Sequence, residues 1–435
     1  MIETPTPQER RAARWVAGLF LLIVLLQRFS VPGLPEVALL IPVIIGWVVL
    51  AFIRRVVVLD QSRLTWWLAA AFLTSMAMLI QDRWVPSAEI SITAWGLIFA
   101  VWVPFTVKLV HRASAAYLAM LRYITVISAT LAGGAVMMVG SQLLGLPYRD
   151  WFAERVPESL QLGGFVLSYP IVYGSEIFKA NAWIGLEPSM VSVQIGLGLL
   201  AAIFVQARIA VVVLLLLGLI ATVSGSGIVM VAVGLTVMLV HRCRGLLLRY
   251  AGLALVTVVA STFTPFGQLL LNRSTEFQSS GSSASLRALE PYSVLYPRWI
   301  EQFSGVVFGY GPGSSQRVVN ETNILGLLVP TPAKIFYEYG LIAGLVLAVF
   351  LLMCYWGSPS RTFGLSLLAS LWVLQPGTTT VVIVAPLLVL VTLWSPRIGQ
   401  PIEKLLPPVA TGDGTGSRSP VQRSVLSVWP PLVRK

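Results

Sequence analysis

The sequence has few charged residues and few of the side chains that bind metals. Charged residues make up 11% of the 435 residues, and the chain contains 2 His and 2 Cys. Soluble proteins carry about 25% charged residues, so the composition excludes an ordinary soluble domain. What the chain has instead is apolar, with 56% hydrophobic residues and a mean hydropathy of +0.82. The composition therefore indicates a multi-pass helical membrane protein.

Long apolar runs alternate along the chain with short charged or Pro- and Gly-rich breaks. Runs of about 17–25 residues are long enough to cross a bilayer as helices, so we expect an all-α transmembrane helical bundle of about 12 spans. The runs cover residues 15–29, 35–53, 64–80, 90–110, 122–146, 187–206, 208–223, 226–241, 246–264, 333–356, 361–376 and 380–395. Residues 1–395 thus form a polytopic membrane domain. Residues 396–435 are rich in Pro, Gly and Ser, and we expect a disordered cytoplasmic tail there.

Basic residues are concentrated in alternate connections between these runs. When the N-terminus is placed in the cytoplasm, most of the Lys and Arg fall inside, which is the positive-inside pattern. The inner clusters are Arg54, Arg55 and Arg63, then Lys108, Arg112 and Arg122, then Arg242, Arg244 and Arg249. Both termini then lie in the cytoplasm. The net charge of +12 therefore reports topology and contact with anionic lipid, and it gives no reason to expect nucleic acid as a partner.

Two outer connections, residues 147–186 and 265–332, are too long to be turns, and we expect both to be ordered periplasmic loops. The second contains "VVFGYGPGSSQ" at 306–316, with Gly309, Gly311 and Gly313 on alternate positions. Ser314 stands where a GxGxxG fingerprint needs its third glycine, and no Lys-Ser or Lys-Thr pair follows as a P-loop requires. The run therefore predicts a tight turn whose bare backbone approaches another group closely.

Several motifs follow one another on the outer side in a characteristic order. "GLEPSMVSVQIGLGLLA" covers 185–201, and "TVSGSGIVM" covers 222–230. An Arg-bearing segment, "SSASLRALEPYSVLYPRWIEQFSG", then precedes the glycine turn, and "YEYGLIAG" covers 337–344. This order resembles the O-antigen polymerase and ligase family, the Wzy-like membrane glycosyltransferases. The "EPS" that opens a span is similar to many repeat-unit polymerases, and the matches run from 185 to 344.

The resemblance implies an enzyme of the bacterial inner membrane that polymerises the repeats of O-antigen, capsule or exopolysaccharide. Its donor and acceptor would both be oligosaccharides linked to undecaprenyl diphosphate, joined at the periplasmic face without a cofactor. Membrane lipids are expected partners, and the resemblance leaves room for a chain-length regulator. No nucleic acid is expected.

The chain departs from the ligase branch of that family. Ligases carry a His near the start of the helix that here begins at Ala333, and they favour an Arg where this chain has Gly225. The chain has only His111 and His241, which map to the cytoplasmic side. The resemblance therefore favours a polymerase. The alternatives are an O-antigen ligase and a flippase or transporter for lipid-linked oligosaccharides. Against a transporter, the sequence shows no clear internal repeat.

The chemistry of periplasmic glycosyl transfer sets the kinds of side chain to look for. Cleaving the anomeric bond of a polyprenyl diphosphate donor leaves negative charge on phosphate oxygens, which cations and helix N-termini stabilise. Arginine is favoured because its planar guanidinium pairs with two phosphate oxygens at once. The outer loops offer no His, no Cys and no dense carboxylate cluster. We therefore expect metal-independent catalysis and no metal site.

Three residues are the expected catalytic groups. Arg287 lies in a partly apolar segment spaced for helices along the membrane and interrupted by Pro291 and Pro297. Glu187 and Glu338 would orient or deprotonate the acceptor hydroxyl. Simpler explanations exist: a headgroup contact for Arg287, a helix-start acid for Glu187, and an i,i+4 pair with Lys334 for Glu338. The residues expected to bind the donor diphosphate are Arg273, Arg298, Arg317 and Lys334.

Overall fold

The computed structural model shows a mostly helical protein with two small sheets, which confirms the helical expectation in this coarse form. It describes residues 4–85, 87–165, 167, 169–171, 176–241, 252, 259, 286, 289–322, 324, 327–375 and 378–405. The strands are β1 (Ser30–Val31), β2 (Leu34–Ala38), β3 (Val57–Leu59) and β4 (Val107–Leu109). The helices are α1 (Pro7–Leu26), α2 (Leu40–Ile53), α3 (Gln61–Trp84), α4 (Ile92–Trp102), α5 (Ser114–Leu143), α6 (Trp151–Arg155), α7 (Pro188–Phe204), α8 (Ile209–Ala221), α9 (Gly225–Val240), α13 (Glu290–Glu301), α14 (Phe303–Phe308), α15 (Ser314–Glu321), α16 (Thr331–Met353), α17 (Arg361–Ala369), α18 (Val381–Leu390) and α19 (Ile402–Leu405).

Among the described residues, three helices are long and apolar enough to cross a membrane: α3, α5 and α16. Shorter apolar helices accompany them, among them α2, α7, α8 and α9. Large apolar side chains lie on the surface, such as Phe72 and Leu79 on α3, which are 62% and 66% exposed. A bilayer would cover such a surface. The structure therefore indicates a membrane protein, whereas a bundle of twelve spans is not confirmed.

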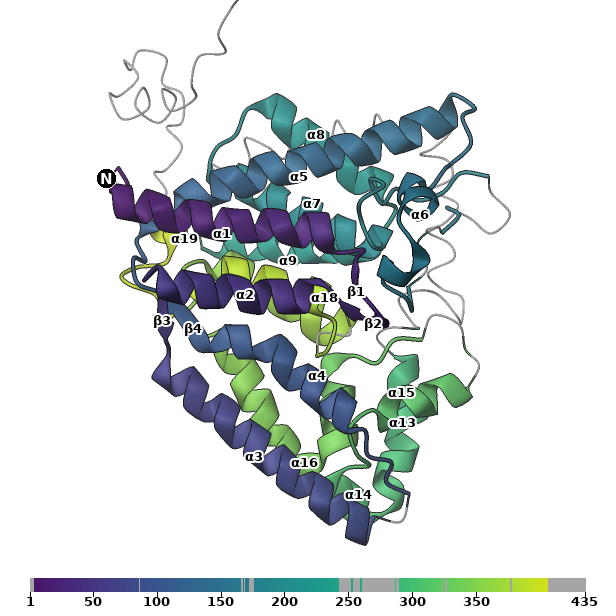
Figure 1. Ribbon diagram of the computed structural model, residues 1–435. Coiled ribbons are helices and arrows are strands. Elements are labelled where there is room, and N and C mark those ends of the chain that lie inside the picture. The colour runs from purple at the N-terminus through teal and green to yellow at the C-terminus, as the bar shows by residue number, and fades with distance from the viewer. Residues whose placement is uncertain are drawn as a thin grey trace, which may run out of the picture.

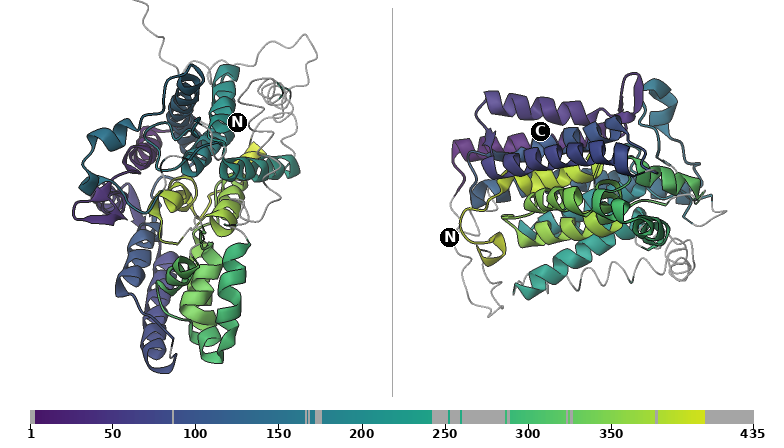
Figure 2. Two further views of the ribbon diagram at one scale, coloured as in Figure 1. Left: turned by 90° about the vertical axis from the view of Figure 1, so that its right-hand side faces the viewer. Right: turned by 90° about the horizontal axis from the view of Figure 1, so that it is seen from below.

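Helix α7 forms the centre of the packing. Every residue from Pro188 to Phe204 is buried, and α7 packs against α5, α8 and α9. A helix without a broad polar face is shielded from water by protein or by lipid, and α7 is shielded by protein. Helices α1, α2 and α5 run side by side across Figure 1, with α1 packed against both of the others, and the left panel of Figure 2 shows several helices nearly end-on.

The connections gather at the two ends of these helices (Figure 1). The start of α1, the β3–β4 sheet and α19 lie at one end, where Val57 of β3 pairs with Leu109 of β4. The described parts of the two long connections lie at the other end, as α6 and as α13, α14 and α15. The described parts of both segments thus lie at the same end of the molecule, and their placement on an outer face stays a prediction.

Several predicted boundaries differ from the structure. The run 90–110 ends as a helix at Trp102, because a 3-10 turn containing Pro104 follows and β4 then pairs with β3. Helix α13 runs through Pro297 instead of being interrupted there. Residues 402–405 of the predicted tail form α19, and the run 246–264 lies almost wholly outside the described residues.

Candidate functional site

Helix α16 is sharply broken in its first half. Gly340 has φ 67° and ψ −173°, which no right-handed helix contains. Residues nine apart in a straight helix lie about 13 Å apart along the axis. A Cβ placed on Gly344 would nevertheless lie 3.2 Å from the carbonyl oxygen of Ile335. Residues 331–339 therefore fold back toward residues 341–353, and backbone groups that a continuous helix would satisfy are left for other partners.

The glycine turn supplies those partners. The N–H of Tyr310 donates to the carbonyl of Tyr337 at 2.9 Å, and the N–H of Gly311 donates to that of Glu338 at 3.0 Å. Gly309 has φ 81°, and a Cβ there would lie 2.5 Å from both the carbonyl oxygen of Glu338 and the N of Gly340. The close approach that the glycines predicted is therefore made to the backbone of α16.

Helix α3 and the segment that follows it hold the same turn from the other side. The side-chain amide of Gln81 donates to the carbonyl of Glu338 at 2.9 Å. The backbone N–H of Glu89 donates to the carbonyl of Tyr310, and that of Ser91 donates to Pro312, both at 3.0 Å. Two segments that lie far apart in the sequence, 81–91 and 337–340, therefore fix this turn in one geometry.

Glu338 is buried within this arrangement, with a relative exposure of 1%. Its carboxylate accepts a 2.6 Å hydrogen bond from the hydroxyl of Ser315. The ammonium of Lys334 lies 3.6 Å from the same oxygen, as the i,i+4 spacing predicts. The carboxylate therefore connects the first half of α16 to α15, and it is enclosed by protein in this structure.

Helix α15 connects all three described cations that were predicted to bind diphosphate. Lys334 reaches it through Glu338 and Ser315. Arg317 belongs to α15, pairs with Glu89 and donates to the carbonyl of Glu89 at 2.7 Å. Each of these cations thus already has a carboxylate partner.

Arg298 of α13 is joined to the last residue of the same helix, because its guanidinium lies 2.8 Å from the carboxylate of Glu321. The hydrogen bond to Glu321 raises the pKa of Arg298. The side chains of both residues are about half exposed, at 47% and 61%. This pair and the Arg317–Glu89 pair therefore lie at the surface, and their cations can exchange partners.

Aromatic side chains hold α13 against the turn. The rings of Tyr310 and Tyr337 stack with centroids 5.0 Å apart, and the hydroxyl of Tyr310 donates to the carbonyl of Arg298 at 2.7 Å. Burial raises the pKa of Tyr310. Tyr337 is 5% exposed, so its ring faces protein.

Glu187 lies at the start of the central helix. It is the N-cap of α7, with Pro188 at the first helical position, and its carboxylate accepts a 3.0 Å hydrogen bond from Ser189. The carboxylate is therefore held at the N-terminus of α7, where the helix dipole favours a negative charge. Arg287 and Arg273 lie outside the described residues.

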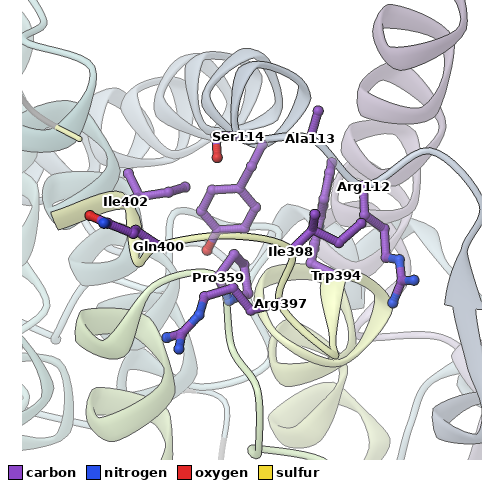
Figure 3. A pocket seen from close by; sticks show the side chains of 10 residues that line it. Arg112, Ala113, Ser114, Pro359, Trp394, Arg397, Ile398, Gln400 and Ile402 are labelled. Atoms are coloured by element: carbon purple, nitrogen blue, oxygen red, sulfur yellow. The ribbon is translucent and has the colours of Figure 1, made fainter. Parts of the chain in front are cut away.

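A pocket at the opposite end of the molecule contains none of the predicted site residues (Figure 3). Arg112 lies on its wall and donates to the carbonyls of Ser395 and Pro396, each at 3.1 Å. This arginine therefore ties the segment after α18 to the start of α5. Within the described part of the chain, no group of three or more His, Cys, Asp or Glu is placed to hold a metal ion.

Sequence reasoning missed the partners that organise the site, namely Gln81, Glu89, Ser315 and Glu321. Ser315 and Glu321 lie directly after the glycine turn, and an amphipathic pattern over 314–321 was the available signal. Gln81 and Glu89 carry no such signal, because they reach the turn only through the fold. Comparisons with known proteins add nothing to this description: no family model, no curated protein and no solved structure matches the chain.

Proposed function

We propose that the protein is a polysaccharide repeat-unit polymerase. It transfers a glycan from a polyprenyl diphosphate donor to a lipid-linked oligosaccharide acceptor at the outer face of the membrane. The acceptor hydroxyl oxygen attacks the anomeric carbon and the bond from that carbon to the phosphate oxygen breaks. The lipid diphosphate leaves with the electron pair. The reaction class comes from the resemblance in the sequence motifs, and the geometry supports it.

The observation that carries the proposal is the convergence of three cations on the short helix α15. Lys334, Arg317 and Arg298 all connect to it, at the end of the molecule where the long connections gather. A departing diphosphate carries more than one negative charge, so it needs several cations held in one place. The glycine turn and the break in α16 supply that rigid support.

The carboxylates beside these cations set how a diphosphate would bind. Exposed ion pairs such as Arg298–Glu321 and Arg317–Glu89 are each worth about 1 kcal/mol or less. A diphosphate can therefore displace the carboxylates and accept bidentate hydrogen bonds from the guanidinium groups. Free of bound substrate, the same carboxylates keep the arginine side chains in place.

The two acids have different roles under this proposal. Glu338 is enclosed and bonded to Ser315 and Lys334, so it acts as a positioning residue for the cations. Glu187 accepts the proton of the acceptor hydroxyl. Arg287 keeps the role that the sequence motif implies for it, stabilising the leaving diphosphate.

The glycan profile of a strain that lacks the protein tests this function. A polymerase deletion leaves single repeats on the final acceptor. A ligase deletion leaves no transferred glycan, and a flippase deletion leaves lipid-linked units on the inner side. Single repeats that grow into a normal ladder when the gene is restored support the proposal. Either of the other two profiles contradicts it.

A further inference from the structure

A small pocket lies inside the helical domain, between α7, α18 and the segment that follows α17. Its cavity volume of about 10 Å³ is the size needed for one water molecule or one hydroxyl group. Its lining combines apolar side chains with three polar ones. The polar side chains are Gln194, Ser370 and Gln375.

These three polar side chains are buried and carry atoms without hydrogen-bond partners. Their relative exposures are 1%, 0% and 3%. Among the described residues, no partner exists for Nε2 of Gln194, Oγ of Ser370 or Nε2 of Gln375. The amide of Gln194 is oriented by its oxygen, which accepts from Gln27 at 3.5 Å. Leaving a buried donor unpaired costs about 1–3 kcal/mol, so three together point to an occupant.

The backbone around the pocket is irregular in two places. Residues 370–374 form a π-helical turn, a feature that occurs frequently at functional sites. Pro386 lies inside α18 and lines the pocket. Because proline has no N–H, it cannot donate to the carbonyl of Val382 four residues earlier, and Val382 also lines the pocket. The carbonyl of Val382 therefore lacks its usual helical donor at position 386.

The lining chemistry selects among possible ligands. The described residues that line the pocket include no Lys or Arg, and an anion buried without a cation is strongly disfavoured. A hydroxyl group both donates and accepts, so it matches the two amide donors and the serine hydroxyl, which can itself accept. We propose that this pocket is a subsite for one hydroxyl or hydroxymethyl group of a sugar, held by Gln194, Ser370 and Gln375.

The position of the pocket connects it to the predicted site. Met190 lines it, and the N–H of Met190 donates to the carbonyl of Glu187 at 3.1 Å. Leu371 also lines it, and its carbonyl accepts from Thr331, the first residue of α16, at 2.8 Å. The pocket thus lies next to the N-terminal ends of both α7 and α16. This inference rests on the proposed function, because it assigns the pocket to the acceptor sugar.

Binding of simple sugars tests the subsite without requiring polymerase activity. The full chain is placed in lipid nanodiscs, and saturation-transfer difference NMR is recorded with the methyl glycosides of glucose, galactose, rhamnose and N-acetylglucosamine. We expect at least one glycoside to bind. Ser370→Ala and Gln375→Leu should each weaken that binding about fivefold, the effect of losing one hydrogen bond.

Ser366→Ala is the matched control. Ser366 is also buried with a hydroxyl that has no partner among the described residues, but it does not line the pocket. This variant should bind like the wild type. If the pocket holds only water, no glycoside binds, or all three variants bind equally, and either result overturns the subsite. If the protein binds a glycoside but the deletion strain shows no polymerase defect, the proposed reaction is rejected and the subsite still holds.

Discussion

The hydroxyl of Ser315 donates a 2.6 Å hydrogen bond to the buried carboxylate of Glu338. This contact joins α15 to the first half of α16, and the i,i+4 pair with Lys334 completes it. The carboxylate would be costly to bury alone, because an ionised group without partners loses its hydration. The glycine turn, the broken helix and the cations thus form one connected unit.

The break in α16 requires glycine at position 340. A Cβ there would overlap the carbonyl of Val307, and φ is +67°. We expect Gly340→Ala to lower the free energy of unfolding by more than about 2 kcal/mol. Gly46→Ala on α2 is the control, since nothing lies within 4 Å of its Cβ position. Thermal unfolding in detergent measures the stability of both variants. Equal unfolding midpoints would contradict the requirement for glycine at position 340.

Lys334 and Glu338 should behave as a coupled pair. Lys334→Met leaves the buried carboxylate without its cation and should cost about 3 kcal/mol of stability. The double variant Lys334→Met/Glu338→Gln should lose less than the single one, because it leaves no buried charge. Glu321→Gln removes the acid of an exposed pair and should cost about 1 kcal/mol or less. A double-mutant cycle on thermal stability measures the coupling. Strictly additive losses would argue against it.

The long connection at 147–186 is anchored by Arg28, whose guanidinium bonds both carboxylate oxygens of Asp150 at 2.8 and 2.6 Å. The side chain of Arg28 is 1% exposed, so Asp150→Asn should cost about 3 kcal/mol. Glu154→Gln breaks the exposed pair with Arg149 and should cost about 1 kcal/mol or less. Unfolding midpoints of the two variants compare them directly, and equal losses would mean that Arg28 does not depend on Asp150.

The stability of the fold should depend on the ionisation of Asp60, the N-cap of α3. Burial alone would raise the pKa of Asp60, but the charge and N–H of Arg63 and the ammonium of Lys108 outweigh it and lower the pKa below its usual 3.8. A lowered pKa stabilises the fold above pH 3.8, and that contribution is lost as the pH falls further. Asp60→Asn should therefore be less stable than the wild type at pH 7. The difference should shrink below about pH 4, and a constant difference across the pH range would contradict this cause.

The parts of the fold that could be predicted are those set by local pattern. The run 187–206 matches α7 (Pro188–Phe204) and 226–241 matches α9 (Gly225–Val240), because uninterrupted apolar sequence and Pro188 mark the helix limits. The break at Gly340 was not predicted, since a glycine within an apolar run is compatible with a straight helix. It is stabilised by the turn at 309–313, which lies far away in the sequence.

The candidate site divides in the same way. Lys334 and Glu338 are four residues apart on one helix, and the structure shows the ion pair that this spacing predicts. The carboxylate partners of the arginines are not local: Arg317 pairs with Glu89. Sequence spacing therefore identified the partner of Lys334 but not those of Arg298 and Arg317. The roles of these groups in catalysis stay predictions.

Glycan extension by the purified protein tests the central claim most directly. The protein in liposomes is given lipid-linked repeats isolated from the deletion strain, with a metal chelator and no nucleotide sugar. We expect a ladder of longer lipid-linked glycans. Arg317→Gln should slow its formation about tenfold, while Arg149→Gln, an exposed outer arginine paired with Glu154, should not. No ladder from the wild type, or a ladder only when nucleotide sugar is added, would contradict the proposed reaction.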